Sequence, residues 1–438
     1  MRLSCSKTAT AFLSQEALIV WLLSTTVVFC QLLPTDTLKG TSERSPLIYI
    51  YDLPARYRTQ EFGPHFDTWT YGAEKRVPLM LRKAGYTTED PAKADFFYVD
   101  AWLYSMGHSN ITKRDLPNES LSREETMVRI VVEYLRSKWP YWDANGGRDH
   151  IWTFTYDHGF CGFTSGSASL DEVASSVILA QWGLTDYEAP CSLQERLDNF
   201  NNCPARVQLQ DARASGRPTP HHLPCFTPGK AIQMQRLVMP VIAKHKEHKL
   251  FFAGQVRPRE LHYSHGVRQT VIKLFNNTRG FRLISNNPYE KGPDDSPRLD
   301  HMELMAEMGR SHFCLAPTGD GFGNRLKLAI AVGCIPLVIQ DRVLVAFEHI
   351  LPYEDFAIRL PQHFIYRLPD ILDEVLADDQ RVREMRGRLA CASRHFSWDE
   401  HEGRAVDVLA CALKQRKLGV PLKMRMDWGF CLFHCDAP

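Results

Sequence analysis

A chain of 438 residues is too long to fold around a single hydrophobic core, so we expect two folded domains. Hydrophobic residues make up 44% and charged residues 24% of the sequence, a composition typical of a globular protein. The formal net charge of +1 provides no basic surface for a phosphate backbone and so excludes nucleic acid as the expected partner.

The first apolar segment of the chain predicts a membrane anchor. Residues Ala17 to Leu33 carry no charged side chain and, as a helix, would span about 26 Å at ~1.5 Å per residue. Arg2 and Lys7 precede the segment, which favours a cytoplasmic N-terminus. A cleavable signal peptide has a similar layout, but no small-residue cleavage site is evident. The expected order is a cytoplasmic tail at 1–16, a signal-anchor helix at 17–33 and a stem at 34–46.

The anchor would place the bulk of the chain in the lumen of the secretory pathway. Its span is short, which suits the thinner membranes of the early compartments, and we expect a single-pass type II protein of the Golgi membrane. Three sequons, at Asn110, Asn118 and Asn276, fit a glycosylated lumenal surface.

Ten of the twelve cysteines follow the predicted anchor, and in an oxidising lumen some of them should pair. Cys314 and Cys334 lie in strand-like apolar runs and are equally consistent with buried thiols. Near the C-terminus, Cys431, His434 and Cys435 favour a terminal disulfide over a metal site, because no second ligand pair has zinc spacing.

After the stem, apolar runs at 47–53, 95–103 and 150–157 predict buried strands. Between the second and third runs, apolar side chains from Met127 to Leu135 recur on one helical face. Strands separated by helices predict a parallel sheet that is covered on both sides.

A polar, irregular stretch from about residue 190 to 220 predicts a surface insertion. His221 and His222 follow it, and we interpret them as solvated loop histidines rather than metal ligands, because no partner ligands accompany them.

Beyond residue 240 the alternation of strand and helix begins again. Asp300 and Glu303 predict a capping box at a helix start, and Gly309 predicts the end of that helix. The expected elements are strands at 249–254, 312–316 and 334–340, and helices at 299–309, 324–333 and 402–416.

The two patterns predict α/β domains at 47–240 and 241–416, followed by a tail at 417–438. Two such domains imply a cleft between them, where small ligands usually bind.

The loop between the strand at 312–316 and the next helix has the features of a diphosphate site. Gly319 and Gly321, with Asp320 between them, allow backbone amides to approach a ligand closely. Asn324 starts the helix, whose first turn carries unpaired amides and the positive end of the helix dipole. Arg325 adds a planar cation that we expect to face the cleft with little packing. The loop has neither Walker A nor dinucleotide spacing, and a Gly-rich turn with a solvated arginine is the alternative.

Residues 311–340 read SHFCLAPTGDGFGNRLKLAIAVGCIPLVIQ and resemble the donor-site signature of the exostosin family of glycosyltransferases, in its plant and green-algal branch. The segments LFFAGQVRPR at 250–259 and FEHILPYEDFAIRL at 347–360 also match the family. Three further matches are YIYDLPARY at 49–57, DPAKADFFYV at 90–99 and GGRDHIWTFTYDHG at 146–159.

The resemblance spans most of residues 47–415 in the family's order. Lys327 departs from it, because an acidic residue is common at that position in the family, and this leaves the donor sugar open.

The resemblance implies a GT-B-type fold, with two facing Rossmann-like domains and a cleft between them, and an inverting mechanism. In such an enzyme a base deprotonates an acceptor hydroxyl, which displaces the nucleoside diphosphate in one step. It would transfer a hexosyl or pentosyl group from a nucleotide sugar to a glycan or glycoprotein in the secretory pathway.

For donor binding, the resemblance implies that Arg325, the loop amides and Arg257 or Arg259 suit the diphosphate. Glu348, or else Asp341, would accept hydrogen bonds from the ribose hydroxyls, the alternative for Glu348 being an ordinary surface acid.

The catalytic base is expected in the first domain. Asp157 and His158 follow a predicted strand at the end where α/β proteins usually bind ligands. Asp157 could instead cap a turn, and Asp100 is an alternative base. No DxD motif is present and the Pro-Asp-Asp run at 293–295 is interpreted as a solvated loop, so neither a metal nor a cofactor beyond the nucleotide sugar is expected.

A second function stays open, namely a catalytically inactive lumenal glycan-binding or partner subunit on the same fold, within a homo- or hetero-oligomer. The intact Arg325 and Gly-rich loop favour an active donor site. A secreted hydrolase is the least favoured function, because no metal cluster or nucleophile elbow is present.

Overall fold

The computed structural model describes residues 44–59, 72–108, 123–155, 172–173, 175–180, 183–184, 221–224, 245–258, 263–285, 299–317, 324–341, 343–348, 350–399, 401–419 and 431. The predicted tail, anchor and most of the stem lie outside these residues, as do the sequons at Asn110 and Asn118 and the predicted insertion at 190–220. All described residues belong to one unit of the chain that begins at Arg44. None of the helices described has the length and apolar character to cross a membrane.

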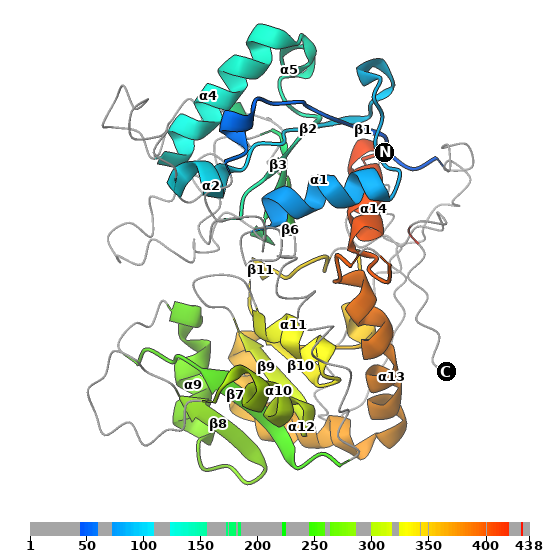
Figure 1. The fold of residues 1–438 in the computed structure, drawn as a ribbon. Helices are drawn as coiled ribbons and strands as arrows, with labels where there is room; N and C mark the ends of the chain where they lie inside the picture. Colours follow the sequence, from blue (N-terminus) through cyan, green and yellow to red (C-terminus); the bar gives the residue numbers. More distant parts are fainter. Residues whose placement is uncertain are drawn as a thin grey trace, which may run out of the picture. The chain divides into compact units, whose positions relative to one another are not determined.

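The first sheet has five parallel strands in the order β1-β2-β3-β4-β6 (Figure 1). Every residue of β2, β3 and β4 is buried, as expected of a parallel sheet that is covered on both faces. The strands are β1 (Ile48–Ile50), β2 (Phe96–Tyr98), β3 (His150–Thr153), β4 (Val177–Ala180) and β6 (His221–Pro224). The three strands predicted here are confirmed, although each ends earlier than expected.

His221 and His222 lie in a strand rather than in a loop, so their interpretation as loop residues is wrong. They pair in register with Val177 and Ile178 of β4. Strand β6 is at the edge of the sheet, where polar side chains are tolerated, and its polar sequence therefore hid it.

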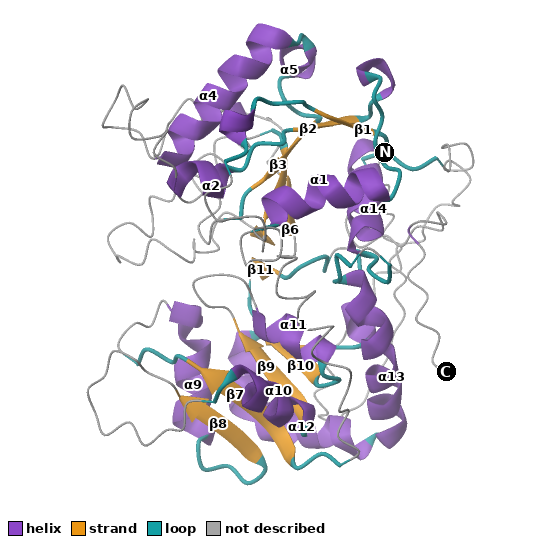
Figure 2. Ribbon diagram, viewed as in Figure 1, coloured by secondary structure: helices purple, strands orange, loops and turns teal. Residues whose placement is uncertain are grey.

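Helices cover both faces of this sheet (Figure 2). Alternate strand residues face two different cores: Trp152 packs in a core with α4, and Ile151 in a core with α1. The predicted apolar face of α4 is confirmed, since Met127 and Leu135 are fully buried. The helices are α1 (Ala73–Lys83), α2 (Leu103–His108), α4 (Arg123–Lys138) and α5 (Tyr141–Asn145), with short 3-10 helices η2 (Ala55–Tyr57) and η4 (Pro91–Lys93).

The second sheet also has five parallel strands, in the order β12-β10-β9-β7-β8. Its strands are β7 (His248–Gly254), β8 (Phe281–Ser285), β9 (Ser311–Pro317), β10 (Ile335–Ile339) and β12 (Ile358–Arg359). Its helices are α9 (Val267–Phe275), α10 (His301–Gly309), α11 (Asn324–Ala331), α12 (Leu368–Ala377) and α13 (Asp379–His395), with 3-10 helices η7 (Tyr263–Gly266), η8 (Tyr353–Asp355) and η9 (Gln362–Arg367). The capping box of α10 is confirmed: Glu303 N donates to Asp300, and Asp300 N donates to Glu303.

Two disulfides have both cysteines among the described residues. Cys314 of β9 is bonded to Cys334, directly before β10, so two neighbouring strands are covalently joined and the buried-thiol alternative is wrong. Cys411 is bonded to Cys431, which agrees with a disulfide rather than a metal site near the C-terminus.

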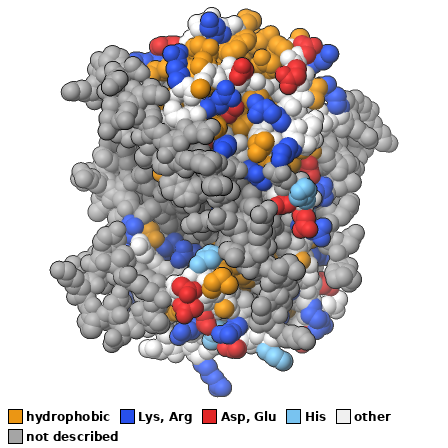
Figure 3. All heavy atoms as spheres, viewed as in Figure 1, with side chains coloured by type: hydrophobic (Ala, Val, Ile, Leu, Met, Phe, Trp, Pro, Cys, Tyr) orange, Lys and Arg blue, Asp and Glu red, His pale blue; other side chains and the backbone are white. Residues whose placement is uncertain are grey.

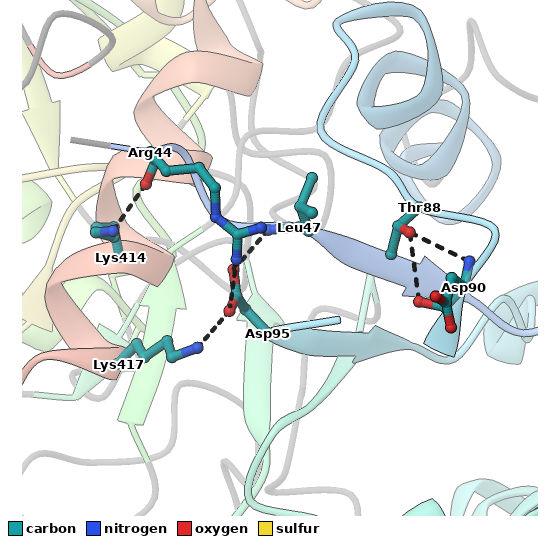
Figure 4. Close-up of polar contacts among 7 residues, drawn as sticks. All are labelled: Arg44, Leu47, Thr88, Asp90, Asp95, Lys414 and Lys417. Atoms are coloured by element: carbon teal, nitrogen blue, oxygen red, sulfur yellow. Dashed lines mark hydrogen bonds and ion pairs between the residues drawn. The ribbon is translucent and has the colours of Figure 1, made fainter. Parts of the chain in front are cut away.

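The helix α14 (Ala405–Lys417) follows the second sheet in sequence but is bonded to the first (Figure 4). Lys414 Nζ donates to the carbonyl of Arg44 at 2.7 Å. Asp95, just before β2, pairs with both Lys417 and Arg44 and accepts a hydrogen bond from Leu47 N at 2.8 Å. Helix α14 thereby holds in place the two segments that lead into β1 and β2.

A second contact between the two halves is an antiparallel pair formed by β5 (Gly183–Leu184) and β11 (Val343–Leu344). On the described part of the face in Figure 3, acidic and basic side chains are interspersed, which agrees with the near-zero net charge.

Candidate functional site

Arg325 lies in the first turn of α11, next to the carboxyl end of β7. Its Nε and Nη2 donate to the carbonyl of Ala253, at 3.1 and 2.7 Å. A Cβ at Gly254 would lie 2.7 Å from Arg325 Nη2, so only glycine permits this approach. Burial lowers the pKa of Arg325, but an arginine remains charged at any physiological pH. The expectation of a loosely packed arginine is therefore wrong: this cation is partly buried and fixed to the sheet.

The location of Arg325 is that of a ligand site in an α/β protein. Strands β7, β9 and β10 are parallel, and ligands usually bind beyond the carboxyl ends of such strands. The helix begun by Asn324 is the next described element after β9, so its positive end faces the same edge of the sheet. The side chain of Asn324 and the loop residues Gly319, Asp320 and Gly321 lie outside the described residues.

Arg257 lies on the turn that follows β7, and Arg259 is outside the described residues. The backbone of Arg257 has a φ of 48°, a left-handed conformation that is uncommon for a residue with a side chain. Its guanidinium carbon lies 4.2 Å from the centroid of the Tyr263 ring. Tyr263 also acts electrostatically on Arg325, raising the pKa of that guanidinium against the effect of burial.

Glu348 is buried, so the alternative of a surface acid is wrong. Its Oε2 accepts from Val345 N at 3.0 Å, and its Oε1 forms an ion pair with Arg359 Nε at 3.1 Å. The preceding Phe347 has a φ of 56°, so the carboxylate stabilises a strained turn after β11. Asp341 is exposed, and both its oxygens accept from Gln362 N.

At the first sheet, Asp157 and His158 lie outside the described residues, which stop at Thr155 and resume at residue 172. Asp100, the alternative base, is buried after β2. Its carboxylate contacts Arg58 Nη1 at 3.4 Å and Arg82 Nη2 at 3.9 Å. Burial raises the pKa of Asp100, although both arginines act in the opposite direction.

Sequence reasoning missed a second buried acid at this edge, Glu74 in the first turn of α1. Its Oε1 accepts from Tyr104 N at 2.7 Å and from Thr155 Oγ1 at 3.2 Å. Its Oε2 is buried without a hydrogen-bond partner in the described part of the chain. Burial raises the pKa of the Glu74 carboxyl well above its usual range, and Asp100 raises it further. Glu74 shares the apolar helix face of Val77 and Leu81, and this spacing was the available signal.

Comparison with known proteins shows the family of this chain. The model of the exostosin GT47 domain matches residues 42–375. The chain belongs to the exostosin GT47 family of glycosyltransferases. This confirms the resemblance seen in the sequence, and the similar proteins below are plant proteins, as the plant-type signature predicted.

Two relatives from Arabidopsis thaliana illustrate the family. The chain is 25% identical over 343 residues to a probable glucuronoxylan glucuronosyltransferase, covering 75% of this chain and 64% of that protein. It is 24% identical over 345 residues to a probable beta-1,4-xylosyltransferase, covering 76% and 74% respectively. The exostosin-family chain thus spans less than two thirds of the length of the first of these relatives.

Solved structures show weaker likeness. The GtfA/B complex superposes with a TM-score of 0.36 and 12% identity, over 67% of this chain and 61% of that one. Anabaena Alr3699/HepE in complex with UDP and glucose gives a TM-score of 0.34 and 9% identity, over 86% of this chain and all (100%) of that one.

Proposed function

We propose that this exostosin-family protein is an inverting glycosyltransferase that moves a hexosyl or pentosyl group from a nucleotide sugar to a glycan or glycoprotein. The observation that carries the proposal is the arginine of α11 held against β7 at the carboxyl edge of a parallel sheet. A fixed cation at a helix N-terminus suits a diphosphate whose negative charge grows as the glycosidic bond breaks.

In the proposed reaction the acceptor hydroxyl attacks the anomeric carbon, and the nucleoside diphosphate leaves from the opposite face. Arg325 and Arg257 would neutralise the charge that develops on the leaving diphosphate. Because both guanidiniums are already oriented by contacts within the protein, little reorganisation would be needed during the reaction. Glu348, whose carboxylate is engaged by Arg359, would shape the wall of the ribose site.

The base would come from the first sheet, where the chain runs from Thr155 toward Asp157 and His158. Its task is to take the proton of the acceptor hydroxyl as the new bond forms. We further propose a GT-B arrangement, with the donor on the second sheet and the acceptor on the first.

A screen of the purified protein against a panel of nucleotide sugars tests the function. Transfer to a xylan or other glycan acceptor, or slow hydrolysis of one donor, is the expected result. If no nucleotide sugar binds, the protein is instead an inactive partner or glycan-binding subunit on the same fold.

We also propose that residues 17–33 anchor the protein in the Golgi membrane with its bulk in the lumen. Asn276 supports this proposal, because it is exposed at the end of α9 and accessible to a glycan. In sealed microsomes the main body should resist added protease until detergent is present, and glycosidase should lower its mass. Digestion without detergent would contradict the topology.

A further inference from the structure

The turn between β7 and α9 is strained in a way that a plain connection does not require. Among its described residues, Arg257, Ser264 and His265 have φ values of 48°, 58° and 53°, all in the left-handed region. Each such residue is less stable there than in an ordinary conformation. Backbone strain of this kind persists only where surrounding contacts impose it, and it is common at ligand sites. The contacts that impose it here therefore indicate which side chains the turn serves to position.

Gln269, in the first turn of α9, supplies several of these contacts. Its Nε2 donates to the carbonyl of Arg257 at 3.1 Å and to that of Tyr263 at 3.2 Å. Its Oε1 accepts from Ser264 Oγ at 3.2 Å. One amide side chain thus donates to two backbone carbonyls of the turn and accepts from the hydroxyl of Ser264, a combination that needs a group with both a donor and an acceptor.

Arg268 lies beneath the same turn and is buried. Its Nη1 donates to the carbonyl of Gln255 at 2.9 Å and to the hydroxyl of Tyr263 at 2.5 Å. Its guanidinium carbon lies 4.6 Å from the Tyr263 ring centroid and 5.6 Å from that of Phe252. Because Arg268 is buried, we assign it a role in stabilising the turn rather than in contacting a ligand.

Two guanidiniums therefore contact the Tyr263 ring: the guanidinium carbon of Arg257 lies 4.2 Å from the ring centroid and that of Arg268 lies 4.6 Å from it. Aromatic faces attract cations, and the attraction is largest where water is excluded. Both cations lie on the same aromatic side chain, next to the turn that follows β7. The strained turn thus brings the Arg257 guanidinium and the buried Arg268 guanidinium to one aromatic side chain.

We propose that Tyr263 is the platform that orients Arg257 toward a diphosphate group, and that Arg268 and Gln269 are positioning residues that hold this platform in place. The inference rests on the proposed function only for the identity of the molecule that carries the diphosphate. The contact between Tyr263 and Arg257 would preorganise the site, because a cation that is already oriented before the ligand binds loses little conformational freedom on binding.

Binding of inorganic pyrophosphate tests the proposal, because pyrophosphate carries the diphosphate without base or sugar. We expect Tyr263→Phe, which keeps the ring, to bind it within about threefold of wild type. Tyr263→Leu removes the ring and should weaken binding roughly 5- to 30-fold, as expected for a cation–π contact. Gln269→Glu keeps the shape of the side chain but replaces the donating amide with a carboxylate, which repels the carbonyls of Arg257 and Tyr263. This variant should weaken pyrophosphate binding by a similar factor.

The matched control is Lys273→Gln, which removes an exposed cation from the same helix and should leave pyrophosphate binding unchanged. Melting curves of the full-length protein accompany each titration. If Tyr263→Leu fails to fold, Arg257→Gln provides the readout, since it removes the oriented cation itself. With an active donor, the variants should raise the KM for the donor and leave the KM for the acceptor unchanged.

Wild-type affinity for pyrophosphate in Tyr263→Leu, Gln269→Glu and Arg257→Gln would overturn the inference, as would a wild type that binds no pyrophosphate. A protein that binds pyrophosphate with the expected ranking but transfers no sugar would support this inference and refute the proposed function. A protein that transfers sugar equally well in all variants would do the reverse.

Discussion

Arg325 is the side chain on which donor binding is expected to depend most. Replacing it with Ala removes a charge-assisted contact that strengthens as the leaving group departs, at a cost of roughly 2–4 kcal/mol, or about 30- to 1,000-fold in rate. Arg325→Lys should restore only part of the rate, because an ammonium lacks the planar fork. Both are measured as turnover and donor affinity, with melting curves alongside.

The hydrogen bonds to Ala253 add a stability effect to this prediction. Arg325→Ala should lower stability by about 1–2 kcal/mol, because it removes the two guanidinium donors to the Ala253 carbonyl. Gly254→Ala should weaken donor binding without removing any charge, since its Cβ would displace the guanidinium. Wild-type turnover in both Arg325→Ala and Gly254→Ala would show that the diphosphate binds elsewhere.

Glu74 should give the protein a pH-dependent stability. The unfolded chain releases this proton near pH 4.5, whereas the folded protein retains it to a much higher pH. Because the folded state then binds more protons, the contribution of Glu74 to stability is fully present below pH 4.5. It is lost as pH rises toward the folded pKa, at ~1.4 kcal/mol per pKa unit.

Glu74→Gln cannot ionise and should therefore be more stable than wild type near pH 7.5, with the difference vanishing near pH 4.5. The melting temperatures of both proteins across this range are the measurement. Glu133→Gln, at an exposed acid of α4, is the control and should change little. A Glu74→Gln difference that does not vary with pH would show that the carboxyl ionises normally.

At the scale of elements, the segment between α13 and α14 depends on one glycine. A Cβ at Gly403 would lie 2.4–2.6 Å from backbone atoms of Ser397 and Asp399, and backbone cannot move aside cheaply. Gly403→Ala should therefore cost ~3 kcal/mol or more. Gly85→Ala, whose Cβ would meet nothing within 4 Å but whose φ is +75°, should cost only about 1–2 kcal/mol. Equal melting temperatures of the two variants would contradict this account.

The regular elements could largely be predicted from the sequence, because strands such as β7 and β9 are continuous apolar runs and α10 carries its own capping box. Strand β6 could not, because an edge strand needs no apolar pattern. The bonding of Cys314 to Cys334 could not either, since it follows from the parallel register of β9 and β10, which only the fold defines.

In the candidate site too, some features could be predicted from the sequence and others could not. Arg257, Arg325 and Glu348 could be found from local motifs, but their surroundings could not, because those are set by side chains distant in sequence. Arg325 contacts Ala253 across 72 positions of the chain. Glu74 contacts Thr155 across 81 positions, and so its burial was not visible from its own segment beyond the helical spacing.

For the whole molecule, we expect transfer to be independent of divalent metal. Arginine and helix-start amides would supply the charge that a metal supplies in other transferases, and the chain has no DxD motif. Activity should therefore survive an excess of EDTA. An enzyme that loses activity in EDTA and regains it with manganese would show that the diphosphate is held by a metal.

The attachment of α14 to the first sheet has a consequence for how the protein is made. The strands of that sheet leave the ribosome well before α14 does, yet Leu409 of α14 shares a core with Ile48 and Val177 of the sheet. Until α14 is synthesised, one apolar face of the first sheet lacks part of its cover. We expect the nascent first half to need chaperone protection, and chains that end before α14 to aggregate or be degraded rather than accumulate as folded protein.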